Sequence, residues 1–408
     1  MTGRLLVLLF GLALALGAQN RPRIRAVTVF IEVDKNNYAT KIQEAQTFLA
    51  AAKSALNEAG FAGAGGRITT QPFPLYTKGM PRDEALALIR NMREVAVKGH
   101  SAFNIGPAMI NDDDDPASVE LLAAAITQAG VVGSLIVADE KGIHWHAIQQ
   151  AAHLIKDLSQ HSPHGDANFN FAAIAMMKPY GPYYPGSYHL GHGHAFAIAM
   201  EGADVVGSVF SQYHDPEQAE LHLSHAFATY TKEAEAVALK LATETGWSYE
   251  GIDATPAPSF ENSIATAMES FVGGPFGSAG TMTAAGIITR AVQSTSVKRT
   301  GYSGLMIPVM EDKGLARRWT EGTFNVDSIL AYSAVCAGGV DTVPLPGDVS
   351  EEQIARIIGD VAWLARKWNK PLGARLLPAP GKQVGEATEF TGALLTNTTI
   401  QPLPGSKH

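Results

Sequence analysis

The feature that most constrains the fold of this chain is a regular alternation between short apolar segments and longer amphipathic ones. Arg25–Val33 alternates and is rich in β-branched residues, which is typical of a strand. Tyr38–Ala59 then carries apolar residues at helical spacing and stops at Gly60, as helices commonly do. The same order of strand and helix recurs along the chain, and it favours an α/β architecture with a largely parallel sheet.

Further elements follow from the same patterns. The other expected strands lie near Arg67–Thr70, Ser101–Ile105, Gly133–Val137, Phe169–Met176, Tyr249–Asp253, Gly304–Val309, Asp341–Pro344 and Gly373–Leu377, and two more apolar stretches lie at Ala195–Met200 and Ala203–Phe210. The expected helices lie near Arg82–Val97, His146–Ser159, Pro216–Thr243, Ser263–Phe271, Thr283–Val292, Lys313–Thr320, Val326–Val335 and Glu351–Trp368. With about ten strands and no linker, we expect one domain, built as an open sheet or as a barrel larger than the common eight-stranded one. In either case, reactive groups are expected at the C-terminal ends of strands.

The N-terminal residues 1–18 have the pattern of an export signal. Arg4 supplies a positive charge, Leu5–Leu16 is apolar, and small residues stand just before Gln19. A membrane anchor is the alternative, but the apolar stretch is shorter than the roughly 20 residues that a spanning helix needs. We therefore expect a mature domain of residues 19–408 that is periplasmic or secreted and has no stable membrane insertion after cleavage.

Charge and cysteine content narrow the classes of partner and chemistry. The net charge is -8 and the basic residues are not concentrated in any stretch, so nucleic acid is not an expected partner. The single cysteine, Cys336, rules out an internal disulfide framework and is more typical of a small buried apolar residue than of a reactive thiol.

The segment Pro179–His194, PYGPYYPGSYHLGHGH, is the strongest candidate for a functional site. It holds three histidines that are separated by glycines able to let the rings converge: His189, His192 and His194. Neutral imidazoles bind zinc, copper, nickel or iron, so these residues are the expected ligands of a divalent metal ion. The alternative is a polar surface loop, or histidines hydrogen-bonded beneath the tyrosines.

Carboxylates and hydroxyls elsewhere in the sequence suggest further site residues. Four carboxylates lie at the ends of predicted strands, where α/β folds mount acid–base groups: Asp253, Glu311, Asp312 and Asp341. Of these, Asp253, Glu311 and Asp312 are the candidate catalytic residues. Glu311 and Asp312 also fit a plain helix start, which leaves a structural role open. The glycine-rich stretch Gly273–Gly280 could hold an anion at the start of the next helix. The expected substrate-binding residues are Tyr184, Tyr188, Thr281 and Ser303.

The C-terminal half carries a specific series of short motifs in a fixed order: Gly251-Ile252-Asp253, Ala279-Gly280-Thr281, Tyr302-Ser303-Gly304, Glu311-Asp312-Lys313-Gly314 and Gly339-Val340-Asp341. In these motifs, and over nearly the whole mature length, the chain resembles the uncharacterised bacterial and archaeal family called domain of unknown function 711. The resemblance implies a ten-stranded β/α barrel like that of pyruvate formate-lyase-like proteins. It implies no activity, because none is established for the family.

The histidine segment departs from the family pattern, in which an aromatic residue is followed by His-Gly-x-Gly-Glu. Here His189 keeps the first imidazole, His192 falls near the place of the glutamate, and His194 is additional. Similar members are also usually intracellular, whereas this chain has the pattern of an export signal. Fold relatives with glycyl radicals use a barrel cysteine and a C-terminal glycine. Gly392 lacks the Arg-Val-x-Gly-Tyr setting of that glycine, so we expect no glycyl radical.

Together these observations predict an exported, metal-assisted enzyme, a hydrolase or lyase that acts on a small polar molecule. The histidines would hold the metal, and the carboxylates would act as a base or as oxygen ligands. The alternative is a non-catalytic protein that binds a small molecule or a metal. The expected partner is a small-molecule ligand, and homo-oligomer formation stays open.

Overall fold

A single sheet organises the chain in the computed structural model, which describes residues 21–259 and 261–403. Its strands are β1 (Ile24–Ile31), β2 (Gly65–Thr70), β3 (Ala102–Pro107), β4 (Val132–Ala138), β5 (Phe171–Ala175), β6 (His194–Glu201), β7 (Ser248–Ala257), β8 (Gly338–Pro346) and β9 (Leu372–Ala379). Their order in the sheet is β7-β6-β1-β2-β3-β4-β5-β9-β8. The expected export signal, residues 1–18, lies outside the described residues.

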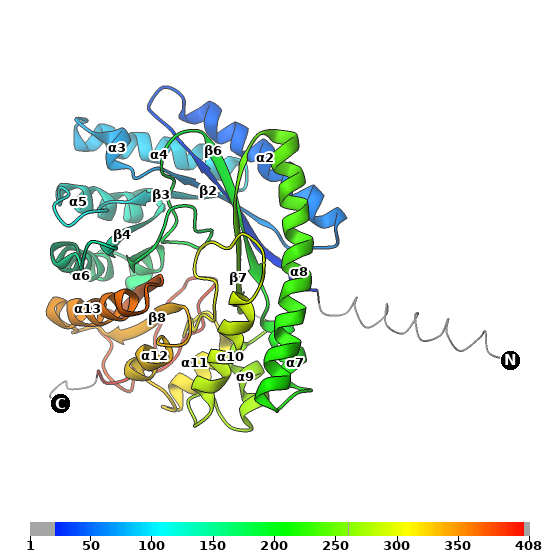
Figure 1. The fold of residues 1–408 in the computed structure, drawn as a ribbon. Helices are drawn as coiled ribbons and strands as arrows, with labels where there is room; N and C mark the ends of the chain where they lie inside the picture. Colours follow the sequence, from blue (N-terminus) through cyan, green and yellow to red (C-terminus); the bar gives the residue numbers. More distant parts are fainter. Residues whose placement is uncertain (1–20, 260, 404–408) are drawn as a thin grey trace.

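Helices lie around the outside of the strands (Figure 1). They are α2 (Tyr38–Glu58), α3 (Pro74–Thr77), α4 (Arg82–Lys98), α5 (Ala117–Ala124), α6 (Trp145–Gln160), α7 (Ala203–Phe210), α8 (Pro216–Thr245), α9 (Ile264–Val272), α10 (Thr281–Gln293), α11 (Lys313–Thr320), α12 (Val326–Tyr332) and α13 (Glu351–Trp368). Short π and 3₁₀ segments occupy Ala125–Ala129 and Pro163–Asn170. In the described part of the chain, none of these helices has the length and apolar character needed to cross a membrane.

The strands run in two opposite directions, and this decides where a site can form. β1 to β5 are parallel to one another. At one edge β6 is antiparallel to β1 and parallel to β7, and at the other edge β9 is antiparallel to β5 and parallel to β8. Each end of the sheet therefore brings together the starts of some strands and the ends of others.

The α/β class and the mainly parallel sheet are confirmed, but the ten strands are not, since the described residues form nine in an open order. The expected strand at Gly304–Val309 is not a regular strand. Asp253 of β7 accepts hydrogen bonds from the backbone N–H groups of Tyr302 and Ser303, at 2.7 and 3.0 Å. These N–H groups are therefore used by a side chain, and Ser303 adopts a positive φ of 46° that interrupts an extended strand.

Local sequence explains most of the remaining elements. The long helix α8 begins where the Asp215 carboxylate accepts hydrogen bonds from the N–H groups of Glu217 and Gln218, and it ends at Gly246, which is left-handed. One apolar stretch, Ala203–Phe210, is a helix rather than a strand, because Gly202 ends β6 and its carbonyl starts the turn of α7. A run of apolar residues this short does not distinguish the two structures by itself.

The inner face of the sheet is filled by the loop between β5 and β6, residues 176–193, which we call the central loop. The backbone carbonyl of Pro182 accepts from the Thr28 hydroxyl of β1 at 2.8 Å, and that of Pro185 accepts from Asn104 of β3 at 3.0 Å. Tyr184 donates to the carbonyl of Ile68 in β2 at 2.8 Å. The central loop thus runs across several strands from the inside, which explains why these strands are buried on both faces.

Candidate functional site

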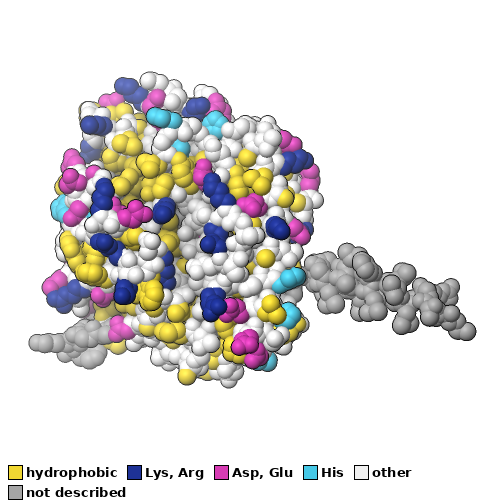
Figure 2. All heavy atoms as spheres, in the orientation of Figure 1, with side chains coloured by type: hydrophobic (Ala, Val, Ile, Leu, Met, Phe, Trp, Pro, Cys, Tyr) yellow, Lys and Arg dark blue, Asp and Glu magenta, His cyan; other side chains and the backbone are white. Residues whose placement is uncertain are grey.

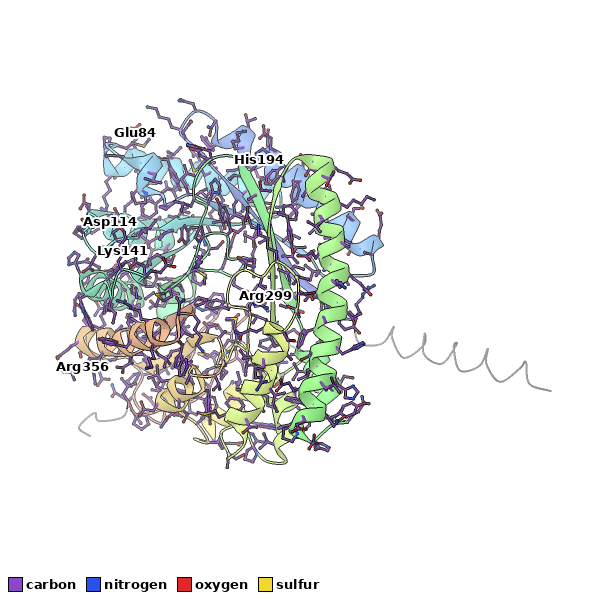
Figure 3. All side chains as sticks on the ribbon, in the orientation of Figure 1. Glu84, Asp114, Lys141, His194, Arg299 and Arg356 are labelled. Carbon is purple, nitrogen blue, oxygen red and sulfur yellow. The ribbon has the colours of Figure 1, made fainter. Side chains whose placement is uncertain are left out.

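The histidines lie where the central loop returns to the sheet, at the end of β1 and the start of β6. Figure 3 labels His194 at this end of the molecule. A cavity of about 720 Å³ opens here, and its lining includes Glu32, Asp34, Gln71, Tyr76, His189, His192, His194 and Trp247. The cavity is large and open, so what it can do depends on how the three imidazoles are placed.

The three rings have different surroundings. His189 is fully buried, and neither ring nitrogen has a hydrogen-bond partner in the described part of the chain. His192 is on the surface with its Nδ1 3.0 Å from a Glu32 carboxylate oxygen, and the His194 ring packs 4.5 Å from the Trp247 ring. Gly191 and Gly193 separate the three histidines, and both adopt positive φ, so the chain turns at each of them. These turns leave the three rings in different places.

The expected metal centre is therefore wrong. Among residues 21–259 and 261–403, no group of three or more His, Cys, Asp or Glu side chains is placed to hold a metal ion. A structural metal site needs several ligands converging on one point, and the three histidines do not supply such a point. The four aspartates at 112–115 do not supply one either; Asp114 accepts hydrogen bonds from the backbone of Ile110 and Asn111.

The burial of His189 should make the stability of the folded protein depend on pH. Burial lowers the pKa of His189 below its usual value. As pH falls through the unfolded-state pKa near about 6.5, the unfolded chain takes up a proton that the folded chain resists, so the folded state loses stability. We expect His189→Phe to reduce the loss of thermal stability that wild type shows between pH 7 and pH 5, measured as Tm by calorimetry. His146→Gln, at an exposed position on α6, is the control and should keep the wild-type pH dependence. If His189→Phe keeps the wild-type pH dependence of Tm, His189 is not a cause of the loss of stability at low pH.

A second cavity, at the opposite end of β1 and β2, has a different chemistry. It has a volume of about 230 Å³, and its charged lining residues are Arg25, Arg67, Arg375, Glu311 and Asp341. We call it the arginine pocket. Tyr183, Tyr184 and Pro185, at the inner turn of the central loop, form part of its wall, together with Phe169, Asn170, Pro258 and Met306.

Strand direction explains how the arginine pocket is assembled. Arg25 and Arg67 stand near the starts of β1 and β2, whereas Asp341 and Arg375 lie within β8 and β9. These strands are far apart in the sheet order, so the sheet must curve for them to line one cavity. The sequence predicted a site at the C-terminal ends of strands. The pocket lies instead beside the starts of β1 and β2, because the outer strand pairs β6–β7 and β9–β8 run opposite to the central five strands.

Two of the arginines, Arg25 and Arg375, contact the same carboxylate group, that of Glu311. Arg375 donates from Nε to Asp341 Oδ1 at 2.7 Å and from Nη2 to Glu311 Oε1. The other oxygen of Glu311, Oε2, lies 3.4 Å from Arg25 Nη2. The side chains of Arg375, Glu311 and Asp341 are each less than a tenth exposed, so these pairs are poorly screened by water. Glu311 thus joins two guanidinium groups that come from strands far apart in the sheet order, β1 and β9.

The third arginine, Arg67, has no such partner. Within the described residues no carboxylate lies within 4 Å of its guanidinium group, which donates to the carbonyl of Pro182 at 3.0 Å and lies 4.9 Å from the centre of the Tyr184 ring. Burial, together with the positive charge of Arg25, lowers the pKa of Arg67 to about 10. The group is still protonated at neutral pH. Glu311 of the same pocket attracts this charge from a distance, but no carboxylate of the described residues is in direct contact with it.

Only part of the predicted catalytic set lines this pocket. Glu311 does. Asp253 is instead fully buried beneath the segment that follows α10, and burial raises its pKa to about 6. Asp312 caps α11 through the N–H groups of Gly314 and Leu315 and also accepts from the Ser263 hydroxyl at the start of α9. Burial raises the pKa of Asp312 as well. Asp253 and Asp312 thus both bind backbone N–H groups and side-chain hydroxyls, and these contacts hold neighbouring segments of the chain together.

The four expected substrate-binding residues do not lie together in one pocket. Tyr184 lines the arginine pocket, whereas the Tyr188 hydroxyl donates to the carbonyl of Met177 at 3.2 Å. Ser303 donates to the carbonyl of Thr300, and the Thr281 hydroxyl accepts from the N–H of Gly277 within the glycine-rich turn. Thr281, Ser303 and Tyr188 are therefore occupied by local backbone contacts.

Sequence reasoning missed all three arginines. One signal was present, because Arg375 is a charged residue inside the otherwise apolar strand Leu372–Ala379, where an unpaired charge would be costly. Arg25 and Arg67 gave weaker signals, since a basic residue near the start of a strand is common at a surface. Their meaning depends on which strands face one another, and that is not visible in a linear pattern.

Comparison with known proteins identifies relatives. Residues 17–394 match the profile of a family described as "Uncharacterised ACR (DUF711)". A UPF0210 protein of Pyrobaculum arsenaticum is 32% identical over 288 residues, covering 68% of this chain and 63% of the relative. A UPF0210 protein of Desulforudis audaxviator is 29% identical over 353 residues, covering 82% and 78%. The matched region thus spans less than two thirds of the Pyrobaculum protein.

Among solved structures, the anaerobic ribonucleotide reductase of Thermotoga maritima in complex with dATP and CTP covers 86% of this chain and 75% of its own, at 11% identity and a TM-score of 0.39. The relatives' names state no activity. Neither those names nor the histidine geometry supports the expected exported, metal-assisted hydrolase or lyase, or a metal-binding role, and that prediction is wrong.

Proposed function

The chain belongs to the uncharacterised DUF711 family, and from that premise we propose that its arginine pocket recognises a small organic anion. The observation that carries the proposal is Arg67, a partly buried guanidinium group with no carboxylate neighbour within 4 Å in the described residues. A charge removed from water is costly unless it is paired and hydrogen-bonded. An oxyanion would meet that requirement, because the planar guanidinium group presents donors that match two oxygens at once.

The other charges of the pocket support the same proposal. Three arginines and two carboxylates line the pocket, so the formal balance of the lining is 3 − 2 = +1. Glu201, outside the lining, lies 3.9 Å from Arg25 and 4.0 Å from Arg23, and counting this pair leaves the balance at 4 − 3 = +1. Arg25 Nε is buried and has no hydrogen-bond partner in the described part of the chain, which gives a second donor beside Arg67. Over the face shown in Figure 2, by contrast, basic and acidic side chains are interspersed. An anion would therefore gain more from the pocket than from this mixed surface.

The size of the pocket limits the ligand. Its volume of about 230 Å³ is smaller than the roughly 300–1,000 Å³ that is usual for drug-sized ligands. Its wall also contains apolar groups, including Phe169, whose ring lies 4.7 Å from the Arg375 guanidinium carbon, and Met306. A metabolite of a few carbon atoms with one anionic group fits this combination better than a nucleotide does.

We also propose that the segment 299–309 completes the ring of strands as an irregular tenth member. Arg299 forms a parallel bridge to Ile252 of β7, and Pro308 forms one to Asp341 of β8, so the segment touches both edge strands. Arg299 lies beside β7 in Figure 3. Such a closure would separate the pocket from solvent on that side and would strengthen its electrostatic interactions.

A ligand screen by thermal unfolding tests the proposal. We expect saturating propionate to raise the Tm of the full chain, because a ligand at about 100 times its Kd stabilises the folded state by about 2.7 kcal/mol. Propionamide has nearly the same shape without the charge and should give no shift. Sodium chloride at equal ionic strength is the second control. Equal shifts for propionate and propionamide, or for propionate and chloride, would contradict anion recognition.

A further inference from the structure

We infer, on the basis of the proposed function, that the anion is a small hydroxy carboxylate whose hydroxyl group donates a hydrogen bond to Asp341. Asp341 lies in β8 and lines the arginine pocket, as does Arg67 in β2. The two residues come from well-separated strands of the sheet. A ligand in the cavity can therefore meet a cationic donor on one wall and an acceptor on another.

Asp341 has one oxygen engaged and one free. Its Oδ1 accepts from Arg375 Nε at 2.7 Å. Its Oδ2 is buried and has no hydrogen-bond partner among the described residues. Buried carboxylate oxygens without a donor are rare, because the lost contact with water is not replaced. A hydroxyl group on the ligand would supply the missing donor.

The charge balance distinguishes the chemical classes of ligand. A carboxylate carries one negative charge and offsets the formal +1 of the pocket, whereas a phosphate monoester carries about −1.5 to −2 and would leave an excess of negative charge. An ammonium group opposite the carboxylate would restore the uncompensated positive charge. A hydroxyl group is neutral and supplies a donor without changing the balance, so a hydroxy acid fits better than an amino acid or a phosphate ester.

Calorimetric titration of the full chain with a matched set of acids tests the inference. The set is propionate, 2-hydroxypropionate, 3-hydroxypropionate and alanine. We expect at least one hydroxy acid to bind about tenfold or more tightly than propionate, as a buried hydrogen bond to a charged group gives. If propionate binds and both hydroxy acids bind within about twofold of it, or alanine binds more tightly than both, this inference is overturned and the proposed function stands. If none of the acids binds, both are overturned.

Two further measurements test whether the tighter binding of the hydroxy acid depends on its hydroxyl group and on Asp341. The methyl ether 2-methoxypropionate lacks the donor and should bind no more tightly than propionate, and this measurement needs no substitution in the protein. In Asp341→Asn, with folding checked by circular dichroism and Tm, the affinity ratio between the better hydroxy acid and propionate should fall towards one. A ratio that stays at the wild-type value in the folded variant would overturn the role of Asp341.

Discussion

Replacement of Arg67 by glutamine is expected to weaken the binding of a small carboxylate by roughly 100-fold, about 2.7 kcal/mol. Glutamine is shorter than arginine, and it lacks both the charge and the paired donors of the guanidinium group. The measurement is calorimetric titration with the tightest acid of the set. The unliganded variant should stay close to wild type in stability, because the loss of the contacts with Pro182 and Tyr184 is offset by the removal of a partly buried charge that has no carboxylate partner.

Arg356→Gln is the matched control for this experiment. Arg356 is exposed on α13, where it pairs with Glu352 one turn away, and Figure 3 shows it far from Arg299. Its loss should leave the affinity at the wild-type value. Arg67→Lys retains the charge without the planar fork, and we expect its affinity to lie between those of wild type and Arg67→Gln. Equal affinities of Arg67→Gln and Arg356→Gln would contradict the role of Arg67.

Replacement of Asp253 by alanine is expected to lower the free energy of unfolding by roughly 3–5 kcal/mol. The buried carboxylate accepts hydrogen bonds from the N–H groups of Thr255, Tyr302 and Ser303 and from the Thr255 hydroxyl. Alanine would leave these buried donors without an acceptor and would release the segment 299–309 from β7. Chemical denaturation followed by circular dichroism measures the change.

The comparison variant for Asp253 is Asp113→Ala. Asp113 is an exposed acid in the turn before α5, and its loss should change the free energy of unfolding by less than about 0.5 kcal/mol. Asp253→Asn retains one acceptor oxygen and should be destabilised less than Asp253→Ala. If Asp253→Ala is as stable as Asp113→Ala, Asp253 does not hold the segment in place, and a role in chemistry would need to be considered again.

The regular part of the fold follows from sequence pattern, and the irregular part does not. β1 and α8 were predictable because side-chain alternation, the cap at Asp215 and the terminating Gly246 all act over a few residues. The segment Gly304–Val309 has the composition of a strand, yet the Asp253 side chain takes the N–H groups just before it. That contact joins residues about fifty positions apart, so no local pattern contains it.

The site was less predictable than the fold for the same reason. The composition of the histidine segment suggested that its three rings converge on a metal ion, but the described residues contain no such group of ligands, and Gly191 and Gly193 between the histidines both adopt positive φ. The central loop instead fills the inner sheet face and carries Tyr184 to the pocket. The pocket's charges come from β1, β2, β8, β9 and the turn before α11, and only the curvature of the sheet brings them together.

Occupancy of the arginine pocket by a small carboxylate can be observed directly by crystallography. A crystal of the full chain soaked with a bromine-labelled small carboxylate, measured at the bromine absorption edge, locates the ligand directly. We expect an anomalous peak inside the cavity lined by Arg25, Arg67 and Arg375, with the carboxylate in contact with Arg67, and no such peak in Arg67→Gln crystals. Peaks confined to surface arginines or to the cavity beside His194, with the arginine pocket empty, would contradict it.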